Sequence, residues 1–92
     1  MQPSLSVSKS WVVNQATRMA RSAGLNAEFV WEPAAAPSWE QISVLLDGRR
    51  EPFLAVLLSD LLLSTDDAET RKQILFDIRI ELTTLVRVRK AG

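Results

Sequence analysis

The segment from Phe53 to Leu63 constrains the fold of this chain most. Nearly every side chain in it is apolar, with Ser59 and Asp60 as the interruptions. Pro52 precedes it, and proline suits the first position of a helix because its missing amide would have no partner there. The sequence therefore predicts a helix with apolar side chains on almost every face. Such a helix has to be buried on almost every face, and it is far shorter than the roughly 20 residues needed to cross a bilayer.

The chain offers few elements that could cover this helix. With 92 residues it lies at the lower end of the range for one domain, and a chain of this length buries only about 60–65% of its unfolded surface. Hydrophobic residues nevertheless make up 47% of it. We therefore expect a second chain, either another copy or a different protein, to cover part of the apolar surface.

Two further helices are predicted in the first half of the chain. Apolar residues recur at helical spacing over 11–23, where Ser10 is placed to cap the helix and Gly24 to end it. Another helix is predicted over 39–47, because Ser38 and Gln41 fit a capping box and the Asp-Gly pair at 47–48 supplies a stop. Residues 25–37 between them form a strand, a turn or a short helix, and the sequence leaves these alternatives open.

The last helix is the best marked of all. Ser64 or Thr65 can cap it, acidic residues lie in its first turn and basic residues in its last, as the helix dipole favours. Its apolar stripe, of the kind that packs in a bundle, consists of Ile74, Leu75, Ile78, Leu82, Leu85 and Val86. Phe76, Ile80 and Val88 lie off this stripe. They contact a second neighbour, or they belong to a strand, since residues 76–82 also alternate with a period of two.

Together these segments predict an all-α fold, a small bundle of about four helices that self-associates. The helix that starts at Phe53 lies at its centre, and the last helix is its scaffold. Residues 1–9 are expected to form a flexible arm and residues 10–92 a single helical domain. The start of the chain lacks the basic and apolar stretches of a secretory signal, so we expect a cytoplasmic protein.

The absence of histidine and cysteine excludes most familiar catalytic sites. No thiolate nucleophile or cysteine zinc site can form, and the commonest general base is missing. The acidic residues within 66–69 are better explained by helix capping than by metal binding, and Asp77 with Glu81 by a solvated helix face. Asp60 is expected to face water or an arginine. We therefore expect no catalytic residue, no cofactor and no metal, and a protein that is not an enzyme.

The function that fits is a non-enzymatic protein-protein interaction module, such as a small adaptor, assembly factor or subunit, that acts through an apolar helical surface. Tryptophan is enriched at the energetic centres of protein interfaces, and the last two helices carry excess apolar surface. The candidate partner-binding residues are Trp11, Trp31, Leu58, Leu62, Ile78, Leu82 and Leu85.

The alternative is a small dimeric DNA-binding regulator or antitoxin-like protein. Its candidate contacts are Arg87, Arg89 and Lys90, which could reach phosphates from the end of the last helix. The formal net charge of zero, however, gives the chain none of the positive field that marks most nucleic-acid binders. We therefore expect another protein chain as the partner, with a homo-oligomer as the favoured case, and neither nucleic acid nor a membrane.

Overall fold

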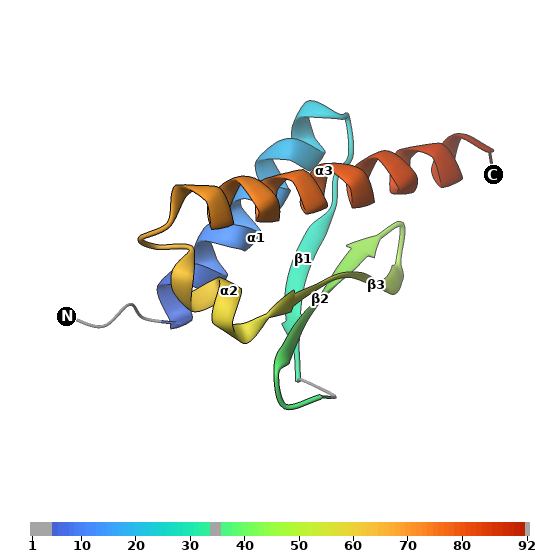
Figure 1. The fold of residues 1–92 in the computed structure, drawn as a ribbon. Coiled ribbons are helices and arrows are strands. Elements are labelled where there is room, and N and C mark those ends of the chain that lie inside the picture. The colour runs from blue at the N-terminus through green and yellow to red at the C-terminus, as the bar shows by residue number, and fades with distance from the viewer. Residues whose placement is uncertain (1–4, 34–35, 92) are drawn as a thin grey trace.

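The chain folds as an α+β domain, with three helices and a three-stranded antiparallel sheet among the described residues (Figure 1). The computed structural model describes residues 5–33 and 36–91, with the backbone alone for 90 and 91. Its elements are α1 (Leu5–Ser22), β1 (Glu28–Glu32), β2 (Trp39–Leu46), β3 (Arg49–Leu57), α2 (Leu58–Leu63) and α3 (Ala68–Ala91). The prediction of an all-α, four-helix bundle is therefore wrong.

The segment predicted as a helix over 39–47 is strand β2, the central strand of the sheet. Asp47 and Gly48 have φ angles of 54° and 76°, and both positions join β2 directly to β3. Positive φ at both central residues defines the hairpin turn that Asp-Gly pairs favour, because its twist matches that of the two strands. The same pair that we interpreted as a helix stop thus reverses the chain between two strands.

The apolar segment behind Pro52 is not one helix but is divided between strand β3 and helix α2. β3 extends to Leu57, and helix α2 covers only the remaining part of it. Pro52 lies opposite Ser43 in an edge strand, beside an irregularity in the register between Ile42 and Ser43. Edge positions and bulges tolerate the missing proline amide. The expected central helix is therefore reduced to α2, the last part of the segment, and burial on every face is not required of the part that forms β3.

Helix α1 starts earlier than predicted but ends as predicted. Residues 5–9 of the expected arm belong to it, Ser10 lies inside it, and residues 1–4 lie outside the described residues. At its end the amide of Leu25 donates to the carbonyl of Ala20 at 2.9 Å, and the amide of Gly24 donates to that of Arg21 at 3.0 Å. These two bonds and the φ of 79° at Gly24 form a Schellman motif. The predicted role of Gly24 is confirmed.

Helix α3 confirms the best-marked prediction, with a different capping residue. Asp67 directly precedes the helix, and its carboxylate accepts a hydrogen bond from the hydroxyl of Thr70. This bond, and the backbone amides of Glu69 and Thr70, lower the pKa of Asp67, because they stabilise the charged form. Ser64, expected as a cap, instead donates its hydroxyl to the carbonyl of Leu61 at 2.7 Å.

The hydrophobic core lies between one face of the sheet and the helices α1 and α3, which pack against each other. The rings of Phe29 on β1 and Phe53 on β3 meet edge to face, 4.9 Å apart between centroids. Lys9 on α1 forms an ion pair of 3.4 Å with Glu40 on β2, so α1 crosses this side of the sheet. The remaining buried apolar side chains are Val12, Ala16, Ala20, Leu25, Ile42, Val44, Val56, Leu61, Ile74, Ile78 and Leu82.

Candidate partner-binding groove

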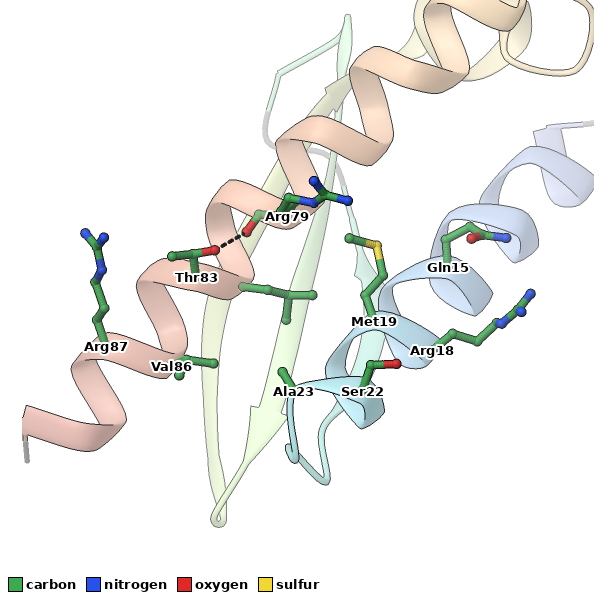
Figure 2. Close-up of a pocket in the computed structure, with 10 residues that line it drawn as sticks. Gln15, Arg18, Met19, Ser22, Ala23, Arg79, Thr83, Val86 and Arg87 are labelled. Carbon is green, nitrogen blue, oxygen red and sulfur yellow. Dashed lines mark hydrogen bonds between the residues drawn. The ribbon is translucent and has the colours of Figure 1, made fainter.

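A groove with a volume of about 670 Å³ runs between α1 and α3 (Figure 2). It exists because the two helices, from opposite ends of the sequence, lie side by side on the sheet. On each side the lining residues recur at the same spacing, i, i+3, i+4, i+7 and i+8, which places them on one face. The lining residues are Gln15, Arg18, Met19 and Ser22 from α1 with Ala23 directly after it, and Arg79, Leu82, Thr83, Val86 and Arg87 from α3.

The floor of the groove is apolar. Leu82 is buried and Met19 and Val86 are half-buried against the core. Figure 2 shows Met19 extending from α1 towards α3, where it approaches the side chain of Arg79. Methionine is flexible and polarisable, and it suits surfaces that accommodate apolar side chains of different shapes. The floor can therefore accept aliphatic or aromatic groups from a ligand.

Three exposed arginines, Arg18, Arg79 and Arg87, line the groove; in Figure 2 Arg79 lies beside Met19, whereas Arg18 and Arg87 extend outward from α1 and α3 at its two rims. None of their guanidinium groups has an ion pair or side-chain hydrogen bond among the described residues. Some basic side chains elsewhere do have partners, since Lys9 pairs with Glu40 and Arg89 pairs with Asp47 at 3.3 Å. The three arginines are thus available to an anionic ligand.

No acidic residue offsets the charge of these arginines inside the groove. None of its lining residues is acidic, helix α1 has no Asp or Glu anywhere along its length, and α3 has none after Glu81. A positive potential over an apolar floor favours a ligand that is itself amphipathic, with an apolar side and acidic groups.

The candidate residues predicted from sequence do not form one surface. Ile78 lies in the core with none of its surface exposed, and Trp11 and Leu85 are half-buried against the core. Leu58 is half-buried, and Leu62 is exposed on α2. Of these residues, Leu82 lines the groove.

Trp31 is half-buried and held by α1. Its indole Nε1 donates to the backbone carbonyl of Lys9 at 3.2 Å, and the Lys9 ammonium lies 5.2 Å from the centroid of the ring. A second hollow of about 540 Å³ lies beside this contact, lined by Leu5, Ser6, Lys9, Ser10, Val13, Asn14 and Trp31. Because the polar and cationic partners of Trp31 lie within the chain, its contacts are explained by the docking of β1 onto α1.

The residues of the DNA-binding alternative are also separated. Arg87 lines the groove, whereas Arg89 is engaged with Asp47. The side chain of Lys90 lies outside the described residues.

Sequence reasoning missed Arg18, Met19 and Arg79 as site residues. A signal for them exists in the sequence, because the first 27 residues contain no acid and the spacing of the lining residues is the same on both helices. The groove itself could not be predicted, since it depends on two helices meeting from opposite ends of the chain.

No protein family matches this chain, and neither curated proteins nor solved structures give a match. Within residues 5–33 and 36–91, no cluster of three or more acidic side chains could hold a metal ion. In the same part of the chain, none of the helices has the length and apolar character required to span a bilayer.

Proposed function

We propose that this protein is a non-enzymatic protein-interaction module that binds an acidic amphipathic helix of a partner protein in the groove between α1 and α3. The observation that carries the proposal is the set of three unpaired arginines around an apolar floor. A partner helix would bury its apolar side on Met19, Leu82 and Val86 and direct its carboxylates towards the arginines. Carboxylates form strong, frequently bidentate hydrogen bonds with guanidinium groups.

The shape of the groove supports a helix as the ligand. Its walls extend over about two turns of α1 and of α3, or roughly 12 Å along each axis. Amphipathic helices dock in such grooves through apolar anchors spaced by three, four and seven residues. Arg79 and Arg87 are two turns apart on α3, so we expect the partner helix to carry acidic residues about two turns apart.

The DNA-binding alternative has less support. A phosphate backbone would leave the apolar floor formed by Met19 and Val86 unused. Arg89, one of its candidate contacts, is paired with Asp47, and the chain as a whole has a net charge of zero. Phosphate binding depends mainly on unpaired basic groups and on a positive field.

Peptide binding measured by fluorescence anisotropy tests the proposal. The ligand is a labelled amphipathic helical peptide with leucines on one face and glutamates beside them, and the comparison peptide has lysine in place of each glutamate. We expect the acidic peptide to bind at least about tenfold more tightly, since like charges disfavour the basic one. Equal affinity for the two peptides would contradict the proposal.

Charge reversal in the protein locates the binding site. Arg18→Glu and Arg79→Glu should each weaken binding of the acidic peptide by about tenfold or more. Arg49→Glu is the matched control, because Arg49 is exposed on β3 and does not line the groove. An equal loss in the Arg49 variant would show that binding is not specific to the groove. Displacement of the acidic peptide by a short DNA duplex at physiological salt would favour the DNA-binding alternative instead.

A further inference from the structure

Helix α3 carries a second stripe of side chains, all of them exposed and separate from the stripe that packs on the sheet. Its residues recur at alternating spacings of four and three, the period of a helix-helix interface. The stripe consists of Glu69, Gln73, Phe76, Ile80, Thr83 and Arg87. Phe76 and Ile80, at its centre, are 57% and 45% exposed. Two large apolar side chains are therefore in water on a helix that lies along the outside of the molecule (Figure 1).

The stripe is symmetric about the level of Ile78. Phe76 and Ile80 lie at equal distances along the helix on either side of it, and so do Gln73 and Thr83. The outermost pair, Glu69 and Arg87, has opposite charges. A two-fold axis makes an interface in which residue i meets residue j of the other copy, and residue j meets residue i.

We propose that a second copy of this chain docks antiparallel along α3, with the two-fold axis at the level of Ile78. Phe76 of each copy then packs against Ile80 of the other, and Glu69 of each copy lies beside Arg87 of the other. Apolar contacts occupy the centre of the interface and charges its ends, the arrangement that protein interfaces favour.

The charges at the two ends of the stripe favour the antiparallel orientation over the parallel one. A parallel pair would place Glu69 beside Glu69 and Arg87 beside Arg87, and like charges in contact are unfavourable. The groups concerned are available: Arg87 has no ion pair among the described residues, and Glu69 contacts Lys72 at 3.7 Å through side chains that are 83% and 75% exposed. Such exposed pairs are weak and readily exchange partners.

The dimer is distinct from the groove, although the two surfaces are adjacent. Thr83 and Arg87 border both surfaces, whereas Glu69, Phe76 and Ile80 do not line the groove, and Arg18 and Arg79 do not belong to the stripe. Peptide binding that depends on Arg18 and dimerisation that depends on Phe76 are therefore independent results. If experiments contradict one of the two proposals, the other is not contradicted by the same result.

Sedimentation velocity of the full chain over a concentration series tests the dimer. With two large apolar residues from each copy the interface is small, so we expect a reversible monomer-dimer equilibrium in the micromolar range or weaker. The double variant Phe76→Ser with Ile80→Ser should remain monomeric at concentrations where the original chain dimerises. Val88→Ser is the matched control, because Val88 is 65% exposed on the same helix but lies off the stripe. A chain that stays monomeric at every concentration, or a dimer unaffected by the double variant, would overturn the proposal.

A charge exchange tests the orientation. Glu69→Arg alone and Arg87→Glu alone each create two like-charge contacts in the antiparallel dimer, and each should weaken it about threefold to tenfold. The variant that carries both substitutions recreates both opposite-charge pairs and should regain the original dissociation constant. Additive weakening in the double variant would reject the antiparallel register. Circular dichroism spectra identical to that of the unchanged chain confirm that each variant is folded.

Discussion

Arg89 near the end of α3 contacts Asp47 in the turn between β2 and β3 through two atom pairs. Nε of Arg89 lies 3.3 Å from Oδ2 of Asp47, and Nη2 donates to Oδ1, also at 3.3 Å. The contact joins parts of the chain that are 42 positions apart. Asp47 also has a φ of 54°, which few residues other than glycine, asparagine and aspartate adopt readily. Asp47 thus has two roles, in the turn and in the ion pair.

Substitutions at Asp47 separate these roles. Asp47→Asn keeps a residue that tolerates the left-handed backbone, and the lost ion pair is exposed on both sides, so the free energy of unfolding should fall by less than about 1 kcal/mol. Asp47→Ala should lose about 1 kcal/mol more, because alanine disfavours this conformation. Urea unfolding measures both values, with Arg89→Gln as the variant that removes the ion pair alone. Equal losses for Asn and Ala would contradict the importance of the turn.

Substitutions at Gly24 and Gly48 test the effect of backbone conformation on stability, separately from side-chain packing. Both have positive φ, 79° and 76°, and a methyl group at either position would meet no atom within 4 Å. Alanine at each position should therefore lower the free energy of unfolding by about 1–2 kcal/mol through backbone strain without a steric clash. Gly48→Asn should lose less, since asparagine tolerates this region. Alanine variants as stable as the original chain would contradict the assigned turns.

The sequence predicted those elements whose signals are local. The Gly24 exit from α1 depends on one residue, and α3 combines its charge gradient with an apolar stripe over many turns. Strand β1 was one of the alternatives left open for residues 25–37, whereas β2 was missed because Trp39, Ile42, Leu45 and Leu46 have spacings that also fit a helix. In the structure Ile42, Ser43 and Val44 are all buried in the central strand, so the alternation that marks a strand is weak. The Asp47-Gly48 pair fits both the end of a helix and a hairpin turn. The choice between them depends on whether the flanking segments are helices or strands, and here both flanking segments were predicted as helices.

The candidate groove was even harder to predict from the sequence than the strands. Arg18 and Arg79 are unremarkable as single residues, and what distinguishes them is that they line the same groove without acidic partners. Both properties depend on the packing of α1 against α3. The exposed stripe on α3 could be predicted in part, because the sequence already places Phe76 and Ile80 off the buried stripe.

Ile78 and Ile80 give a matched comparison on one helix. Ile78 has no exposed surface, whereas Ile80 is 45% exposed. Ile78→Ala should lower the free energy of unfolding by about 2–5 kcal/mol, because it removes buried methyl groups and leaves a cavity. Ile80→Ala should change it by less than about 0.5 kcal/mol when measured at a dilution where the chain is monomeric. Urea unfolding of both variants checks this, and a larger loss for Ile80 would mean that the two faces of α3 are assigned the wrong way round.

The cap of α3 predicts a specific dependence on pH. The hydrogen bond from Thr70, followed by the backbone amides of Glu69 and Thr70, holds the pKa of Asp67 below its ordinary value of 3.8. The folded state therefore favours the charged carboxylate, so its contribution to stability is complete well above pH 3.8 and is lost as the pH falls through the lowered pKa. Asp67→Asn keeps a side chain that can cap a helix but cannot titrate.

We expect Asp67→Asn to unfold at a lower urea concentration than the original chain at neutral pH, with the difference shrinking progressively below about pH 4. Thr70→Val should show the same trend, because it removes the first cause of the lowered pKa while leaving the carboxylate in place. Asp66→Asn is the control, since Asp66 is exposed next to the cap and its carboxylate has no hydrogen bond among the described residues. A difference between Asp67→Asn and the original chain that stays constant from pH 7 to pH 3 would show that the charge of Asp67 does not stabilise α3. A similar pH trend in the Asp66 variant would instead assign the effect to the general charge of this turn and not to the hydrogen-bonded cap.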